Sequence, residues 1–134
     1  MYRFFRSEAY EKRFTKLDTA EQQHVTNLER QIKDNPLASK PLGYTFLREK
    51  RINGGKTILF IIYEELQTIL FAKIATKRDQ QDMIDELKEH LKDYQEKVRA
   101  LMKGLKLLSL FLQEYLVTLS KDLLYRLYLN TPVL

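Results

Sequence analysis

The chain has 134 residues and a mass of 16.0 kDa, which suits one domain with a modest core and is too small for two full domains. Its net charge of +5 and pI near 9.3 favour polyanionic partners. The chain contains no cysteine, which excludes disulfides, thiolate metal sites and cysteine nucleophiles and suits a reducing cytoplasm.

The first 35 residues predict a short strand and two helices. Residues 2–6 form the strand, and Ser7 can N-cap a helix that runs to about Leu17. No apolar stretch of signal-peptide length lies in this segment, so secretion is not expected. Asp18 or Thr19 begins the second helix, which Glu21 supports through a capping-box pattern and which stops before Asn35-Pro36. We expect the two helices to pack on a sheet, with the first strand beside the C-terminal strands.

A link of small and polar residues with two prolines, 34–42, leads to a predicted three-stranded meander. Residues 45–52 and 57–63 flank Asn53-Gly54-Gly55, and this turn chemistry is the strongest short-range signal for a β-hairpin. Glu64-Glu65-Leu66 makes the next reversal and leads into residues 68–75. The runs TILFIIY and TILFAKIA are nearly all apolar, as central strands are. The polar chemistry of this region therefore lies at the strand ends.

Cations gather at those ends. Arg48, Lys50, Arg51 and Lys56 lie on the first hairpin, and Lys73, Lys77 and Arg78 lie on or beyond the last strand. Such a group suits a phosphate-rich partner, although an exposed, solvated cation is the structural alternative at each single position.

A third helix is predicted from Arg78 or Asp79, with Met83, Ile84, Leu87, Leu91 and Tyr94 on one face. Composition changes after Tyr94, so we divide the chain into a domain of residues 1–94 and a helical extension of residues 95–134. The extension carries a stripe of apolar residues at helical spacing: Leu101, Leu105, Leu108, Leu112, Tyr115, Leu119, Leu123 and Leu127.

The apolar stripe needs a covering surface. A membrane span is not expected, because Glu114 and Lys121-Asp122 interrupt the apolar run. Three covers stay open: the protein's own domain, a second copy, or a separate protein. We expect a homo-oligomer, in the simplest case a homodimer, that is held through residues 101–128.

Other motifs indicate no further chemistry. His24 and His90 lie on predicted helices without a second ligand at metal spacing, and Gly54-Gly55 joins two strands, where a phosphate loop would join a strand to a helix. We therefore expect neither a metal site nor a cofactor.

The order of these elements resembles the RelE/ParE superfamily, the toxins of type II toxin–antitoxin modules. The resemblance covers about residues 2–94 and rests on YRFFRS, the helical hairpin, LREKRI, the glycine turn and the run FIIYEE to ILFAKIATKRDQQ. It implies an α+β fold in which two N-terminal helices pack on a small antiparallel sheet, here followed by a long C-terminal helix. Proteins of this kind are cytoplasmic, and many are ribosome-dependent mRNA endonucleases, which implies RNA binding, inhibition of translation and a cognate antitoxin.

Site residues follow from the resemblance position by position. Arg51 matches the second basic position of the family strand, and Arg78 matches the arginine after the last strand. Both would stabilise phosphate charge, while Lys56, Tyr63 or Tyr44 would serve in proton transfer. The remaining cations, Arg48, Lys50, Lys73 and Lys77, would bind the nucleic acid or ribosomal RNA.

Three positions depart from the nuclease pattern. Glu49 stands in place of a lysine, Thr57 in place of an arginine, and Ile84 near the place of a tyrosine. The structural alternative for Glu49 is an ion pair with Arg51 or Arg78. Two other functions therefore stay open: a non-catalytic gyrase inhibitor of the ParE kind, and a degenerate toxin fold that acts as a binding scaffold.

Overall fold

The computed structural model describes the backbone of residues 1–129 and the side chains of residues 1–120. The chain divides into two compact units, Met1–Gln95 and the part from Glu96 onward. The first unit contains the whole sheet and its helices. Its elements in chain order are β1 (Arg3–Arg6), α1 (Glu8–Lys16), α2 (Thr19–Asp34), β2 (Lys40–Tyr44), β3 (Leu47–Ile52), β4 (Lys56–Tyr63), β5 (Thr68–Ala75) and α3 (Gln80–Glu89).

The central meander is confirmed. β3 pairs antiparallel with β4, and β4 pairs antiparallel with β5, so residues 57–63 are strand throughout. Gly54 and Gly55 have φ angles of 86° and 79°, a region that costs a side chain energy, which explains why this turn uses glycine. The Glu64–Leu66 turn reverses the chain before β5, with Gln67 in the left-handed region.

The sheet has five strands in the order β1-β5-β4-β3-β2. β1 lies beside β5, as expected, and runs parallel to it, while all other pairs are antiparallel. The prediction missed β2, which falls within the segment taken as a link and reaches just beyond it. Pro41 and Gly43 are poor strand formers, but β2 is an edge strand, where a proline breaks no ladder hydrogen bond on its open side.

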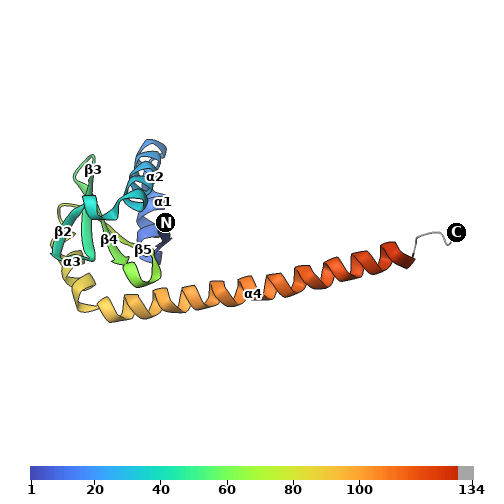
Figure 1. The fold of residues 1–134 in the computed structure, drawn as a ribbon. Coiled ribbons are helices and arrows are strands. Elements are labelled where there is room, and N and C mark those ends of the chain that lie inside the picture. The colour runs from blue at the N-terminus through green and yellow to red at the C-terminus, as the bar shows by residue number, and fades with distance from the viewer. Residues whose placement is uncertain (130–134) are drawn as a thin grey trace. The chain divides into compact units, whose positions relative to one another are not determined.

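Helices α1 and α2 cover one face of the sheet, as predicted (Figure 1). Ser7 caps α1 by accepting a hydrogen bond from Tyr10 N, and Asp18 caps α2 by accepting from Glu21 N. The core between helices and sheet is aliphatic and aromatic: Tyr10, Val25, Leu28, Ile32, Ile52, Ile58, Phe60, Ile62, Ile69, Phe71 and Ile74. Its burial holds the helical hairpin on the sheet.

A buried polar cluster ties β1 to both helices. Arg6 donates to the two oxygens of Glu29 at 2.9 and 2.6 Å, and the Tyr10 hydroxyl donates to Glu29 Oε2 at 2.9 Å. Burial and the nearby Glu29 carboxylate raise the pKa of Tyr10 far above its ordinary value. Because all its polar groups are paired, the cluster fixes the register of β1 against the helices.

Helix α3 lies over the opposite face of the sheet (Figure 1). Its Ile84 and Leu87 are buried, as predicted. The helix does not continue to Tyr94, however. It ends at Glu89, and a new helix, α4 (Leu91–Leu129), begins after His90. No proline or glycine marks this break, and the apolar spacing runs across it, so the sequence gives no sign of it.

The part of the chain from Glu96 onward is a continuous helix as far as Leu129. Between Leu101 and Leu119 it exposes eleven large apolar side chains: Leu101, Leu105, Leu107, Leu108, Leu110, Phe111, Leu112, Tyr115, Leu116, Val117 and Leu119. Leu123 and Leu127, which belong to the predicted stripe, lie outside the residues whose side chains are described. Within the described residues, no helix has the length and apolar character needed to cross a membrane.

Candidate nucleic-acid interface

The predicted site residues lie on two opposite faces of the sheet. Side chains alternate along a strand, so Glu49, Arg51, Thr57, Tyr63 and Lys73 share the α3 face. Residues Arg48, Lys50 and Lys56 belong to the face that carries α1 and α2. The predicted cations therefore cannot form a single site.

Three cations remain together at one end of the sheet: Arg51, Lys77 and Arg78. Arg51 pairs with Thr57 and Thr57 with Ala75, so Arg51 stands in the last row that spans β3, β4 and β5, next to the loop that holds Lys77 and Arg78. All three side chains are exposed, and none forms an ion pair or hydrogen bond with another described side chain. We call these three residues the cationic corner.

The stem of Lys77 lies against the glycine turn. A Cβ atom added at Gly55 would come within 3.1 Å of Lys77 Cε. The β3–β4 turn and the loop after β5 are therefore neighbours, although they are far apart in sequence. This contact gives direct evidence that the two cationic segments converge.

The loop between β5 and α3 is held by Asp79. Its Oδ1 accepts hydrogen bonds from Thr76 N at 2.7 Å and Thr76 Oγ1 at 3.0 Å, and its Oδ2 pairs with Arg13 Nη2 of α1 at 2.5 Å. Burial opposes ionisation, but the hydrogen bonds from Arg13 and Thr76 outweigh it and lower the pKa of Asp79. Sequence reasoning missed Arg13 and identified Asp79 only as a possible start of the third helix.

Glu49 does not form the expected ion pair with Arg51 or Arg78. It is buried, accepts a hydrogen bond from Gln80 Nε2 at 2.8 Å, and lies 3.7 Å from Lys40 Nζ. Gln80 is the first residue of α3, so this bond docks the helix on β3. Glu49 therefore leaves the charge of Arg51 uncompensated.

The other two departures from the nuclease pattern are buried as well. Thr57 is 3% exposed and Ile84 is 7% exposed. Both lie where α3 meets the sheet. The departures are thus compatible with packing of α3, and they add no charge to the surface.

Arg48 is not available to a nucleic acid. Only 8% of it is exposed, and its guanidinium donates to the backbone oxygens of Thr45 at 2.8 Å, Leu37 at 3.1 Å and Ser39 at 2.6 Å. These bonds hold the segment that leads from α2 into β2. The prediction assigned Arg48 to nucleic-acid binding, because the sequence does not distinguish a buried arginine near a strand end from an exposed one.

Lys56 and Lys73 are already paired. Lys56 Nζ lies 2.6 Å from Glu21 of α2, and Lys73 Nζ lies 3.4 Å from Glu86 of α3. Lys50 is half-buried on the α1 and α2 face, away from Arg51. Of the predicted cations, only those of the cationic corner are both exposed and unpaired among the described side chains.

Tyr63 is remote from the cationic corner. It lies six positions from Thr57 on β4, roughly 20 Å at 3.3 Å per residue. Its hydroxyl is buried and has no hydrogen-bond partner within the described part of the chain, and burial raises its pKa to about 12. Such a group neither reaches the corner nor loses its proton near neutral pH. Tyr44, the other candidate, lies on edge strand β2 and stacks on Phe46.

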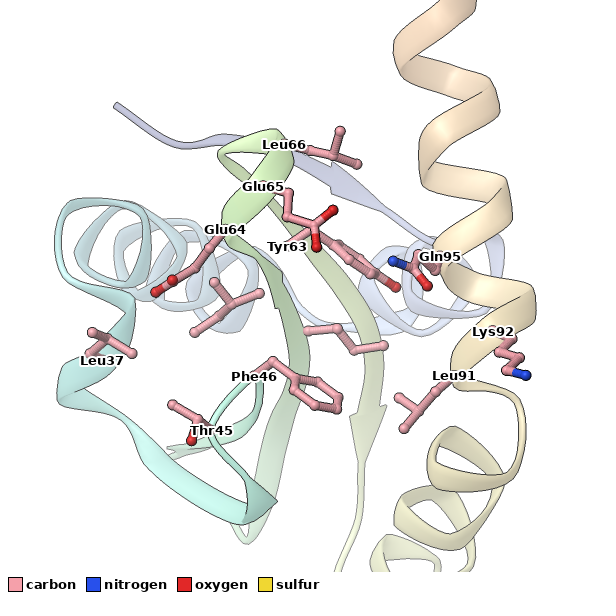
Figure 2. Close-up of a pocket in the computed structure, with 12 residues that line it drawn as sticks. Leu37, Thr45, Phe46, Tyr63, Glu64, Glu65, Leu66, Leu91, Lys92 and Gln95 are labelled. Atoms are coloured by element: carbon pink, nitrogen blue, oxygen red, sulfur yellow. The ribbon is translucent and has the colours of Figure 1, made fainter.

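A pocket of about 470 Å³ lies around Tyr63 (Figure 2). Tyr63 is at the opposite end of β4 from Thr57, the partner of Arg51, so the pocket is away from the cationic corner. Figure 2 shows the Tyr63 ring on the same side of this pocket as Gln95 and Leu91. Its wall is largely apolar: Leu37, Phe46, Ile61, Ile62, Leu66 and Leu91. Two carboxylates, Glu64 and Glu65, and one cation, Lys92, also line it, so its net charge is negative and does not suit a phosphate group. Among the described residues, no cluster of side chains could hold a metal ion.

Solved structures of other proteins share the fold of this chain, whereas sequence comparisons find no match. No family model matches the chain, and no curated protein matches it significantly. Among solved structures, a double arginine mutant of the E. coli toxin RelE in the free state matches with a TM-score of 0.57 and 12% identity, over 66% of this chain and 96% of that chain. The chain has the fold of the RelE toxins.

Two further matches are toxin–antitoxin complexes. The intact E. coli RelBE complex gives a TM-score of 0.52 at 14% identity, over 57% of this chain and 96% of the matched chain. The RelBE2 complex of Mycobacterium tuberculosis gives 0.50 at 19% identity, over 57% and 98%. The RelE fold thus confirms the expected α+β architecture. At these identities, it carries no information on activity.

Proposed function

We propose that this protein is the toxin of a type II toxin–antitoxin module and that it arrests translation by cleaving mRNA on the ribosome. The observation that carries the proposal is the cationic corner on a RelE fold: Arg51, Lys77 and Arg78 stand exposed at one end of the sheet, and none is paired with another described side chain. Three unpaired cations at one place suit a phosphodiester better than they suit a protein core.

The roles within the corner follow from the chemistry of each group. Arginine stays protonated at physiological pH and its planar fork matches two phosphate oxygens, so Arg51 and Arg78 would stabilise charge on the phosphate in the transition state. Lys77 would bind the backbone and supply a proton to the leaving 5′-oxygen, because Tyr63 is too far away and Lys56 is held by Glu21. Solvent water would take the proton of the attacking 2′-hydroxyl.

Two partners belong to the proposal. The first is a cognate antitoxin, as in the E. coli and M. tuberculosis complexes with which this chain shares its fold. The second is the translating ribosome with its mRNA. Both place the protein in the cytoplasm.

We also propose that α4 pairs with its counterpart in a second copy. Leu101, Leu105, Leu108, Leu112, Tyr115 and Leu119 alternate in steps of four and three, the 3.5-residue period of a left-handed coiled coil. A lone helix in water would leave this seam exposed, and a two-fold pair covers the same surface on both copies. The homodimer would therefore be held largely by residues 101–128.

The decisive experiment is induced expression of the wild type and of the double variant Arg51→Ala, Arg78→Ala in bacteria. We expect the wild type to stop amino-acid incorporation within minutes and to produce new mRNA 5′ ends, and we expect the double variant to do neither while remaining folded. A matched control is Arg3→Ala, Arg30→Ala, which removes the same charge from exposed positions outside the corner.

The outcomes separate the candidate functions. Full activity of the double variant would rule out the cationic corner. Continued translation with broken DNA would favour a gyrase inhibitor over a nuclease. Absence of both effects in the wild type would leave a binding scaffold as the better description.

A further inference from the structure

We propose that Arg13 and Asp79 form a clamp that positions Lys77 and Arg78 for the phosphate. The inference deepens the proposed function and rests on it. Under this proposal Arg13, which lies in α1 of the helical hairpin, is a positioning residue for the cationic corner beyond the end of β5.

The clamp closes a very short segment. Both oxygens of Asp79 are engaged: Oδ1 accepts from Thr76 N and Thr76 Oγ1, and Oδ2 pairs with Arg13 at 2.5 Å. A second arm of Arg13 donates to the backbone oxygen of Ile74 at 3.0 Å, on β5 itself. Lys77 and Arg78 are the only residues between Thr76 and Asp79, so the clamp fixes the backbone on both sides of them.

Asp79 serves the loop in preference to the helix that follows it. An aspartate directly before a helix ordinarily turns its carboxylate towards the first free N–H groups of that helix. Asp79 precedes α3 and makes no such bond. Its carboxylate points back into the loop, which indicates that the conformation of the loop, and not the start of α3, is what this residue secures.

A fixed backbone matters for cations with long side chains. Lys77 lies against Gly55, so its direction depends on the distance between the loop and the β3–β4 turn. A displacement of about 1 Å in a catalytic group can lower a rate about 100-fold, even when every group is still present. The clamp holds that distance.

The ion pair is not placed to contribute much to global stability. The Arg13 and Asp79 side chains are 36% and 27% exposed, and pairs with such access to water contribute little to unfolding equilibria. Breaking the clamp should therefore loosen the loop without unfolding the domain. The order of the loop can therefore be measured separately from the stability of the domain.

The test uses Arg13→Gln and Asp79→Asn, with Lys12→Gln as the matched control. Lys12 is the neighbour of Arg13 on α1, and its replacement by Gln removes the same charge. Lys12 pairs with Glu8 of α1 at 3.5 Å and not with a residue of the loop. Arg13→Lys is the conservative variant, which can keep the pair with Asp79 but lacks a second arm for Ile74 O.

Trypsin provides the first measurement, because it cuts after lysine and arginine and the loop contains both. The rate of cutting at Lys77 and Arg78, followed by mass spectrometry on the full chain, should rise several-fold in Arg13→Gln and Asp79→Asn. It should stay unchanged in Lys12→Gln, and the melting temperatures of all variants should agree closely.

Steady-state cleavage of mRNA on purified ribosomes provides the second measurement. We expect kcat to fall at least about 10-fold in both clamp variants with KM nearly unchanged, and Arg13→Lys to recover part of the loss. Unchanged tryptic rates would overturn the clamp. Faster tryptic cutting with wild-type kcat would overturn its positioning role. A wild type that cleaves no mRNA would overturn the proposed function, while the tryptic rates would still decide whether the clamp orders the loop.

Discussion

Arg51 and Tyr63 share one face of the sheet but stand at its opposite ends. Arg51 pairs across the sheet with Thr57, the second residue of β4, whereas Tyr63 is the last residue of that strand. The separation of roughly 20 Å is several times the reach of a hydrogen bond. One phosphodiester therefore cannot touch both residues.

Tyr63→Phe should consequently leave the proposed mRNA cleavage at the wild-type level. The variant should also be as stable as the wild type, or slightly more so, because it removes a buried hydroxyl without a described partner, a group that costs about 1–3 kcal/mol. Cleavage assays and urea unfolding check the two halves of the prediction. A large loss of kcat in a stably folded Tyr63→Phe would show that this hydroxyl takes part in catalysis.

Stability should decrease as the pH rises above about 10. Burial raises the pKa of Tyr63 to about 12, whereas an unfolded tyrosine titrates near 10. Between these values the unfolded chain has released a proton that the folded chain retains, so alkali favours unfolding. Below about pH 10 both states keep the proton, and the contribution is constant.

Urea unfolding at about pH 9, 10 and 11 measures this decline. Tyr63→Phe should make it shallower without abolishing it, because burial also raises the pKa values of Tyr10 and Tyr94. A decline of equal steepness in the variant would contradict the assignment to Tyr63.

Arg48→Met should destabilise the domain by about 2–4 kcal/mol, because it leaves three backbone oxygens without their charged donor. Arg51→Met, three residues further along the same strand, is the matched control and should change stability by less than about 0.5 kcal/mol. Urea unfolding measures both. Equal effects of the two substitutions would show that Arg48 has no special structural role.

Glutamate at Leu112 or Leu119 should dissociate the proposed homodimer, since either change places an unpaired charge in the apolar seam of α4. Leu107→Glu is a suitable control: Leu107 is 67% exposed and lies outside the 3.5-residue repeat. Sedimentation velocity at micromolar concentration distinguishes the states. A wild type that sediments as a stable monomer would remove self-association from the proposal.

Sequence reasoning recovered the parts of the fold that local chemistry determines. Ser7 and Asp18 cap helices with their own side chains, and the two glycines of the β3–β4 turn adopt φ angles that few other residues tolerate. These signals act over a few residues and are visible without a structure. Strand β2 was missed because its residues have a low strand propensity and it forms through its place beside β3 at the edge of the sheet.

The candidate site was only partly predictable. Arg51 and Arg78 were proposed through resemblance and stay a prediction. Whether each of the other cations is exposed depends on burial and pairing, which only the tertiary structure determines. Arg48 and Lys56 meet partners that lie 9 and 35 residues away in sequence. Arg13 and Asp79, 66 residues apart, carry no local sign of their pairing.

The parallel pairing of β1 with β5 has a consequence for synthesis of the protein. Arg3 leaves the ribosome 65 residues before Thr68, its partner on the sheet, so β1 has no place to dock until β5 has been made. Contacts between such distant segments form late in folding. A nascent chain that stops before β5 lacks both this edge of the sheet and the loop with Lys77 and Arg78. The proposed site should therefore form only after β5 and the loop that follows it have been made, and a chain that terminates earlier should lack it.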